Sequence, residues 1–490
     1  MPDLSGQASG RGFGGPLRFE ATIEDCEIVG KIPQDLNGAF YRVGYDWYYP
    51  PKFADDAILN ADGYVSMFRF KGGRVDFRGR WVKTHRLMQE QRARRQLYGY
   101  YRNPYTDDES VRDPQHPNLR TVSNTAPLAH GGKLFSLKED GPPYQLDPNT
   151  LDTIGPWDFN GQWKSETFTA HPKLDPLTGE LVSFGYEATG LASDDVFICT
   201  LDKSGRVRHE TRIKVPYVSM IHDVALTHTH FLIPFGGYVT SAERLRQGKI
   251  HWGWDDSKLS YIGVLPREGQ AKDVRWFKGP LRCMMHTFNA HSEGNKIILY
   301  APFWDSNFFP FFPPVDGTPW NPAKARAFIR KLTLDLSSKS ETWQEEILWP
   351  MQVVDLGKVD PRTLTLQSRY LYTSFTDPDR PYERQRSGAG APARPTNCYG
   401  RFDVATRKID TYFAGPTHSL QECTFVPRGT AEGDGYLIGV ASNYAEGRSE
   451  LIVADAQRLG DGDVARVILP FRVSSQVHGV WASAEELPLV

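Results

Sequence analysis

The stretch Leu174-Asp-Pro-Leu-Thr-Gly-Glu-Leu-Val-Ser-Phe-Gly-Tyr-Glu187 places an Asp and a polar turn directly before an apolar strand-like run. An Asp at this position accepts hydrogen bonds from the backbone amides of the turn, so the pattern predicts a tight antiparallel hairpin. The same signature recurs at Asp147, Asp202, Asp335, Asp403 and Asp455. Because helical periodicity is scarce elsewhere, we predict an all-β chain.

The intervals between these Asp residues are irregular, which excludes a strict tandem array. A radial β-propeller of four-stranded blades with inserted loops explains the pattern best, and a pair of β-sandwiches is the alternative. The insertions we expect are a helix at residues 86–98, a loop at 303–320 and a surface loop at 383–396. We expect one domain over residues 17–490, preceded by a flexible arm over residues 1–16.

Composition narrows the function classes. Among 490 residues, 57 Lys and Arg face 59 Asp and Glu, so we expect no nucleic-acid partner. No run reaches the roughly 18 apolar residues of a membrane span, and the polar, Gly-rich start is unlike a signal peptide. The five cysteines show no C-x-x-C spacing, which is typical of reduced, interior thiols. These features predict a cytoplasmic protein without stable membrane insertion.

Histidines are the candidate metal ligands, because the common hydrolase and nucleotide-binding motifs are absent. His228 and His230 alternate on one strand and would face the same way, but two ligands alone are weak support for a metal site. Four other histidines each lie beside a predicted strand, far apart in the sequence. They are His171, His222, His286 and His478. In a radial fold such positions can converge on the axis, although each taken alone is more typical of a core histidine than of a metal ligand.

Motifs along almost the whole chain resemble the carotenoid cleavage oxygenase family. They include Ile32-Pro-Gln-Asp-Leu-Asn-Gly38, Arg102-Asn-Pro-Tyr-Thr-Asp107, Lys138-Glu-Asp-Gly-Pro-Pro-Tyr-Gln-Leu-Asp147, Ala170-His-Pro172, Ile221-His-Asp223, Gln421-Glu-Cys-Thr-Phe-Val-Pro-Arg428 and Val477-His-Gly479. The resemblance implies a seven-bladed β-propeller whose cap of loops and helices covers an axial iron. It also implies one Fe(II) per chain, with O2 as co-substrate.

The resemblance further implies that His171, His222, His286 and His478 bind the iron. Three carboxylates would orient ligating imidazoles from behind: Glu139, Glu422 and Asp355. The family usually carries Glu where this chain has Asp355. We therefore expect the shorter side chain to need a water molecule or a shifted strand to reach its histidine.

Lys138 and Tyr101, with the run Tyr261-Ile-Gly-Val-Leu-Pro-Arg267, resemble the bacterial lignostilbene dioxygenase and isoeugenol monooxygenase branch. There a Lys and a Tyr bind the 4-hydroxyl of a phenol. The function this implies is cleavage of the interphenyl C=C bond of a 4-hydroxystilbene by O2, giving two aromatic aldehydes. One departure is residues 57–63, Ala-Ile-Leu-Asn-Ala-Asp-Gly, where relatives tend to place a Phe. We expect the loop at 303–320 to supply aromatic surface instead.

The alternatives are cleavage of a propenyl phenol such as isoeugenol, cleavage of an apocarotenoid, and alkene isomerisation without O2. A non-catalytic binding scaffold is the alternative from another class, because fold alone does not dictate function. The sequence is also compatible with a homodimer.

Overall fold

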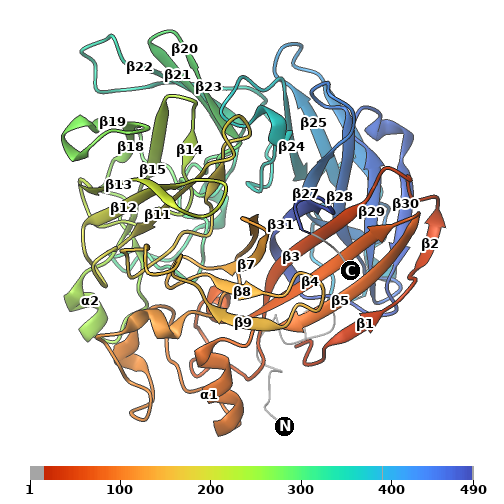
Figure 1. The fold of residues 1–490 in the computed structure, drawn as a ribbon, viewed down its shortest axis with the longest axis horizontal. Helices are drawn as coiled ribbons and strands as arrows, with labels where there is room; N and C mark the ends of the chain where they lie inside the picture. Colours follow the sequence, from red (N-terminus) through yellow and green to blue (C-terminus); the bar gives the residue numbers. More distant parts are fainter. Residues whose placement is uncertain (1–15, 389, 488–490) are drawn as a thin grey trace.

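The computed structural model describes residues 16–388 and 390–487, and in them seven antiparallel sheets form a ring (Figure 1). The prediction of an all-β, seven-bladed propeller is confirmed. The first two blades, each in its strand order, are β1(Ala21–Ile23)-β5(Arg74–Trp81)-β4(Asp62–Lys71)-β3(Gly38–Asp46)-β31(Ser475–Ser483) and β6(Ala126–His130)-β7(Lys133–Leu137)-β8(Tyr144–Leu146)-β9(Thr153–Pro156). The next three are β10(Lys173–Leu174)-β11(Leu181–Tyr186)-β12(Asp195–Leu201)-β13(Val207–Lys214), β14(Ala225–Leu226)-β15(His230–Phe235)-β18(Ser260–Pro266)-β19(Arg275–Gly279) and β20(Asn289–Glu293)-β21(Lys296–Ala301)-β22(Arg330–Asp335)-β23(Gln344–Ile347). The last two are β24(Tyr370–Phe375)-β25(Cys398–Asp403)-β26(Ile409–Phe413) and β27(His418–Pro427)-β28(Gly435–Asn443)-β29(Arg448–Asp455)-β30(Asp463–Ile468)-β2(Glu27–Gly30).

The predicted Asp turns are present at all six positions. In each, the Asp Oδ1 accepts a hydrogen bond of 2.8–2.9 Å from the backbone amide two residues further on. Five of them close a hairpin onto the outer part of a blade, whereas Asp175 joins the innermost strand β10 to β11. The irregular intervals have two causes. One hairpin occupies a different place in its blade from the other five, and the blade β14-β15-β18-β19, between Asp202 and Asp335, contains none of the six turns.

Both ends of the described chain close the ring. β31, near the C-terminus, pairs antiparallel with β3 and so completes the first blade, with Val43 opposite His478. β2 pairs with β30 and extends the last blade. In Figure 1 the red strands β3 to β5 therefore lie beside the blue C-terminal strands. Non-local pairing of this kind makes the position of His478 depend on the closure of the whole ring.

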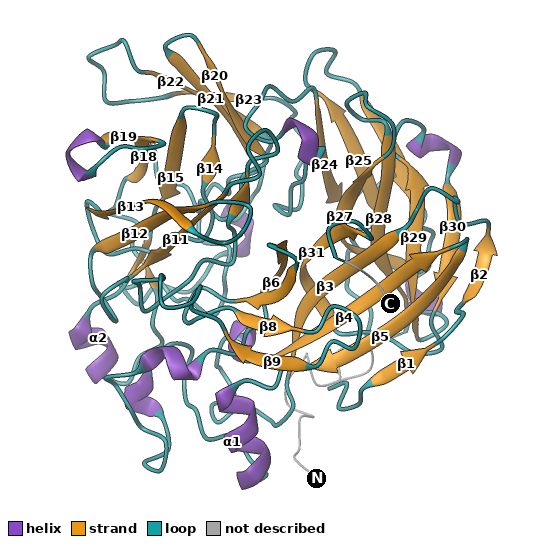
Figure 2. Cartoon of the chain, in the orientation of Figure 1, coloured by secondary structure: helices purple, strands orange, loops and turns teal. Residues whose placement is uncertain are grey.

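The α-helices are few, and α1 and α2 lie at the edge of the ring of sheets (Figure 2). The helix expected at 86–98 is α1(His85–Ala93), which begins at the Thr84 cap and ends earlier than predicted. Arg94 adopts a left-handed conformation with φ of 53°, and this stops the helix. α2(Ala242–Arg246) was not predicted, and α3(Arg384–Ser387) opens the surface loop expected at 383–396. The arm expected over residues 1–16 lies outside the described residues except for its last position.

Apolar side chains fill the spaces between adjacent blades, so each interblade layer has its own core cluster. All five cysteines are buried and unpaired, as predicted. A search of the described residues finds no helix that is both long and apolar enough to cross a membrane. β16(Tyr238–Val239) and β17(Gly253–Trp254) form a small extra sheet within one of the long connections between blade strands.

Candidate metal centre

Four histidines converge where innermost blade strands begin or run. His171 precedes β10, His222 precedes β14, His286 precedes β20, and His478 lies within β31. Consecutive Nε2 atoms are 3.1 Å apart from His171 to His222, 3.1 Å from His222 to His286 and 3.2 Å from His286 to His478. Their ligand atoms all lie within 4.8 Å of one another, and no other such group occurs among the described residues. The structure thus brings together the four positions predicted from the sequence.

Two glutamates hold imidazole rings from behind. The Glu139 carboxylate lies 3.1 Å from Nδ1 of His222, and the Glu422 carboxylate lies 2.8 Å from Nδ1 of His478. The other oxygen of Glu422 accepts a hydrogen bond of 2.7 Å from the backbone amide of Gly479. With Nδ1 facing a carboxylate, each ring carries its proton there and directs an Nε2 lone pair at the cluster.

The third carboxylate makes a poorer contact. Asp355 Oδ2 is 3.2 Å from Nδ1 of His286, but the two groups are not aligned for a hydrogen bond. The same oxygen accepts a well-formed bond of 2.8 Å from the indole N–H of Trp304. Asp355 therefore comes close to His286, while the well-formed hydrogen bond that it accepts comes from Trp304. No carboxylate faces His171 in the described part of the chain.

Burial and charge set the protonation of the cluster. Burial, with the other imidazoles, lowers the pKa of His171 well below its ordinary value, and burial lowers the pKa of His478 to about 4. Burial would also lower the pKa of His286, but the carboxylates of Asp355, Asp223 and Glu422 together outweigh it and raise that pKa. Although burial alone would raise the pKa of Glu139, His222 and Lys138 lower it to about 2. The carboxylates are thus anions, which favour a cation among the imidazoles.

The four Nε2 atoms fit one metal ion. Imidazole nitrogens bind first-row metals at about 2.1 Å, so ligands at right angles lie about 3 Å apart, as the observed spacings do. Neutral imidazole suits iron, copper, zinc and nickel rather than magnesium or calcium. A set of four nitrogens on one ion leaves coordination positions open for a small molecule.

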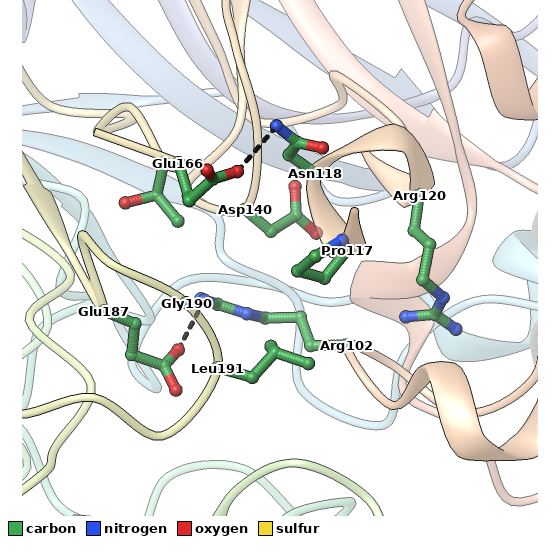
Figure 3. Close-up of a pocket in the computed structure, with 10 residues that line it drawn as sticks. Arg102, Pro117, Asn118, Arg120, Asp140, Glu166, Glu187, Gly190 and Leu191 are labelled. Atoms are coloured by element: carbon green, nitrogen blue, oxygen red, sulfur yellow. Dashed lines mark hydrogen bonds and ion pairs between the residues drawn. The ribbon is translucent and has the colours of Figure 1, made fainter. Parts of the chain in front are cut away.

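A buried polar chain leads away from Glu139 and was not predicted from the sequence. Tyr186 donates to Glu139 Oε2 at 2.8 Å, Arg102 donates to the Tyr186 oxygen at 2.7 Å, and Arg102 also pairs with Glu187 at 2.5 Å. Figure 3 shows the Arg102 guanidinium pointing at Glu187 in the wall of a small pocket. Arg102 and Glu139 both belong to recognised motifs, but nothing local in the sequence marks Tyr186 as their link.

Lys138 and Tyr101 lie together next to this centre. Lys138 immediately precedes Glu139, is buried, donates to the carbonyl of Leu59 at 2.9 Å and lies 5.2 Å from the centre of the Tyr101 ring. It forms no ion pair within the described residues. The Tyr101 side chain is fully buried, and its hydroxyl makes no well-aligned hydrogen bond there. Burial lowers the pKa of Lys138, whereas burial and Glu139 raise the pKa of Tyr101 well above its ordinary value.

The aromatic loop at 303–320 packs toward the same region. The Phe312 ring is 5.7 Å from that of Tyr101, and Phe308 stacks on Trp304 at 4.3 Å. Ala57, at the departure from the family pattern, is buried in the cluster that contains Tyr101 and Phe312. The loop thus supplies aromatic surface beside Tyr101, as expected from the sequence. His228 is exposed and lies with His230 at the start of β15, outside the four-histidine cluster.

Comparison with known proteins identifies relatives of the chain. The family described as retinal pigment epithelial membrane protein matches residues 14–483. The chain belongs to this family, that of the carotenoid cleavage oxygenases. It is 40% identical to lignostilbene-alpha,beta-dioxygenase isozyme III of Sphingomonas paucimobilis, over 100% of this chain and 99% of that protein.

Two further comparisons agree. The chain is 39% identical to isoeugenol monooxygenase of Pseudomonas putida, over 96% of each protein. Its fold matches that of a Pseudomonas brassicacearum lignostilbene dioxygenase with a TM-score of 0.93 and 36% identity, over 99% of each chain. The family and branch expected from the motifs are therefore confirmed.

Proposed function

We propose that the chain is an Fe(II)-dependent dioxygenase that splits the interphenyl C=C bond of a 4-hydroxystilbene. The overall reaction consumes one alkene and one O2 and yields two aromatic aldehydes, so no further reductant is needed. His171, His222, His286 and His478 would hold one iron per chain, with Glu139, Asp355 and Glu422 behind three of them. When bound, the iron would supply the redox chemistry that lets O2 react with the alkene.

The observation that most directly supports a phenolic substrate is the buried charge of Lys138. A buried ammonium without an ion-pair partner among the described residues is costly. The Leu59 carbonyl, the Tyr101 ring and the nearby charges of Asp140 and Glu139 offset only part of that cost, because burial still lowers the pKa of Lys138. An incoming phenolate would supply an opposite charge in direct contact. The same charge lowers the pKa of the bound phenol and so favours its ionised form.

The Tyr101 hydroxyl gives the substrate oxygen a second hydrogen-bonding partner. Because it makes no well-aligned bond to the described residues, it is free to donate to a phenolate. A phenolate held by Lys138 and Tyr101 pushes electron density through its ring to the alkene, where O2 must add. The lysine and the tyrosine would thereby bind, orient and activate the substrate, while the surrounding apolar side chains exclude water.

The similarity to isoeugenol monooxygenase supports a propenyl phenol as the second candidate substrate. Both candidates present a 4-hydroxyl conjugated to the alkene, so both use Lys138 in the same way. The five buried, unpaired cysteines support a cytoplasmic location.

Incubating the iron-loaded protein with 4,4′-dihydroxystilbene, isoeugenol and an apocarotenoid, with mass-spectrometric identification of the aldehydes, tests the proposal. We expect 4-hydroxybenzaldehyde from the stilbene as the fastest product. Vanillin as the fastest product would shift the assignment to isoeugenol. Preferential cleavage of the apocarotenoid, or no aldehyde from any of the three, would contradict it.

A further inference from the structure

A fourth buried carboxylate, Asp223, lies just behind the four-histidine cluster, and it accepts its hydrogen bonds from groups other than imidazoles. It directly follows His222 in the chain and is 1% exposed. Its Oδ1 lies 2.7 Å from the ammonium of Lys173 and accepts a bond of 2.7 Å from the amide of Val224. Its Oδ2 accepts two bonds of 2.9 Å, from the backbone amide and the hydroxyl of Thr287.

Asp223 and its partners Lys173 and Thr287 belong to three different blades. Lys173 is two residues beyond His171, Asp223 is one beyond His222, and Thr287 is one beyond His286. One carboxylate therefore joins the segments that carry three of the four histidines. An ionised carboxylate has about four acceptor positions, and here all four are used by donors that the neighbouring segments supply. We call Asp223 and its partners Lys173, Val224 and Thr287 the node. The node is stiff, because every acceptor position of the carboxylate is used and no donor can move without losing a strong bond.

The fourth histidine is held by other contacts. His478 lies in β31, where its backbone amide donates to Thr125 at 3.1 Å and its ring contacts Glu422. Lys358, 3.0 Å from Glu422, adds a cation at that position. The centre thus has two independent supports, one for His171, His222 and His286 and one for His478.

We propose that Asp223 is a positioning residue that sets the spacing of His171, His222 and His286 through its bonds to Lys173 and Thr287. This role rests on the proposed metal site. The node fixes backbone positions next to the histidines, whereas Glu139 and Asp355 orient individual rings. Losing the node should change where three imidazoles lie and so reduce the affinity for the metal itself.

The test measures binding of Co(II), which takes imidazole ligands as iron does, to the metal-free protein. Affinity is obtained by competition with a chelator, and the visible absorption of bound Co(II) reports the arrangement of its ligands. Asp223→Asn should lower Co(II) affinity by at least about 10-fold, as loss of a residue that orients ligands usually does. An amide presents Nδ2 to Lys173 or to Thr287, and both are donors, so the node cannot re-form.

Three milder variants keep the test open if Asp223→Asn fails to fold. Lys173→Met removes one partner and should lower affinity and alter the Co(II) spectrum, while Lys173→Arg should restore much of both. Thr287→Val removes the hydroxyl bond but keeps the backbone bond to Asp223, so it should have the smallest effect.

Asp195 is the matched control, because it is a buried Asp at 2% exposure that pairs with Arg212. The pair joins β12 to β13, the two outer strands of the blade whose innermost strand carries Lys173, and its hydrogen bonds and ion pair do not involve Lys173, Asp223 or Thr287. Asp195→Asn should lower the melting temperature of the metal-free protein and leave Co(II) affinity within about twofold of normal. If Asp223→Asn and Lys173→Met also lose only stability, with unchanged affinity and spectrum, the positioning role is wrong. If the unmodified protein binds no Co(II), the metal site itself is wrong, and this role with it.

Discussion

Each imidazole of the four-histidine cluster is supported differently, and these differences predict how single substitutions rank. His222 and His478 each have a glutamate behind Nδ1, His286 has the unaligned Asp355, and His171 has no carboxylate. Metal affinity should therefore depend most on the two glutamates. The ranking depends on these individual contacts, because the four imidazoles otherwise share one cluster.

Replacing any one of the four histidines by Ala should remove activity and most of the bound iron, because three imidazoles leave the metal shell incomplete. Iron per chain, measured by elemental analysis, checks this. The matched controls are His228→Ala and His230→Ala, which lie outside the cluster and should keep normal iron and turnover. Full iron and near-normal turnover in one of the four cluster variants would remove that histidine from the site.

Glu422→Gln should weaken iron binding or activity by about 10- to 100-fold, because the amide no longer offers the charged acceptor that holds His478. Asp355→Asn should cost less, since Asp355 lacks an aligned bond to His286 and its best contact is with Trp304. Iron affinity of the two variants, measured side by side, decides the order. Equal losses would show that the alignment of Asp355 with His286 does not determine the importance of the contact.

Lys138→Met should lower turnover of a 4-hydroxystilbene by at least about 10²-fold while iron content stays the same. The 4-methoxy analogue cannot form a phenolate, so it should already be a poor substrate and lose little further in the variant. The measurement is kcat/KM for both substrates with both proteins. Equal losses on the two substrates would mean that Lys138 supports the fold rather than the phenol.

At the scale of elements, the pairing of β3 with β31 is the contact that carries His478 to the axis. Arg42 in β3 reinforces it: the guanidinium donates to Gln476 at 3.0 Å and to Gln421 at 2.5 Å, and the side chain is 1% exposed. The residue thus joins β3, β31 and β27 inside the closed ring. Removing it leaves several buried acceptors without a donor.

Arg42→Met should therefore lower the free energy of unfolding by about 2–5 kcal/mol, because each unsatisfied buried group costs about 1–3 kcal/mol. Chemical denaturation of the metal-free protein measures this. Arg74→Gln is the control, since Arg74 pairs with Asp25 at 3.6 Å and its side chain is 74% exposed. It should change stability by no more than about 0.5 kcal/mol. A similar small change for Arg42→Met would contradict the role assigned to the closure.

Elements also show where prediction from sequence succeeds. The Asp turns were predictable because an Asx turn involves an amide only two residues away, and all six are present. The end of α1 at Ala93 was not, because a helical pattern continues beyond the left-handed Arg94. The four histidines could be proposed as a set only through the family motifs, and Tyr186 was missed because its bond to Glu139 spans 47 residues.

At the scale of the whole molecule, the candidate metal centre joins blades that are far apart in the sequence. A bound ion therefore stabilises the ring as a unit, by about 2.7 kcal/mol when free metal exceeds its dissociation constant about a hundredfold. Removing metal with a chelator should lower the melting temperature by a few degrees, and adding Fe(II) without oxygen should restore it. His286→Ala should abolish the response. A melting temperature that is independent of metal would contradict a site shared between blades.

The central claim is that O2 and a phenolic alkene are converted to two aldehydes. Its most direct test is turnover of 4,4′-dihydroxystilbene by the iron-loaded protein under ¹⁸O2, with rapid reduction of the aldehydes to alcohols before oxygen exchanges with water. We predict two 4-hydroxybenzyl alcohol molecules per alkene consumed, each carrying one ¹⁸O atom. Label in only half of the product would show that one oxygen comes from water, and absence of cleavage would contradict the proposed function itself.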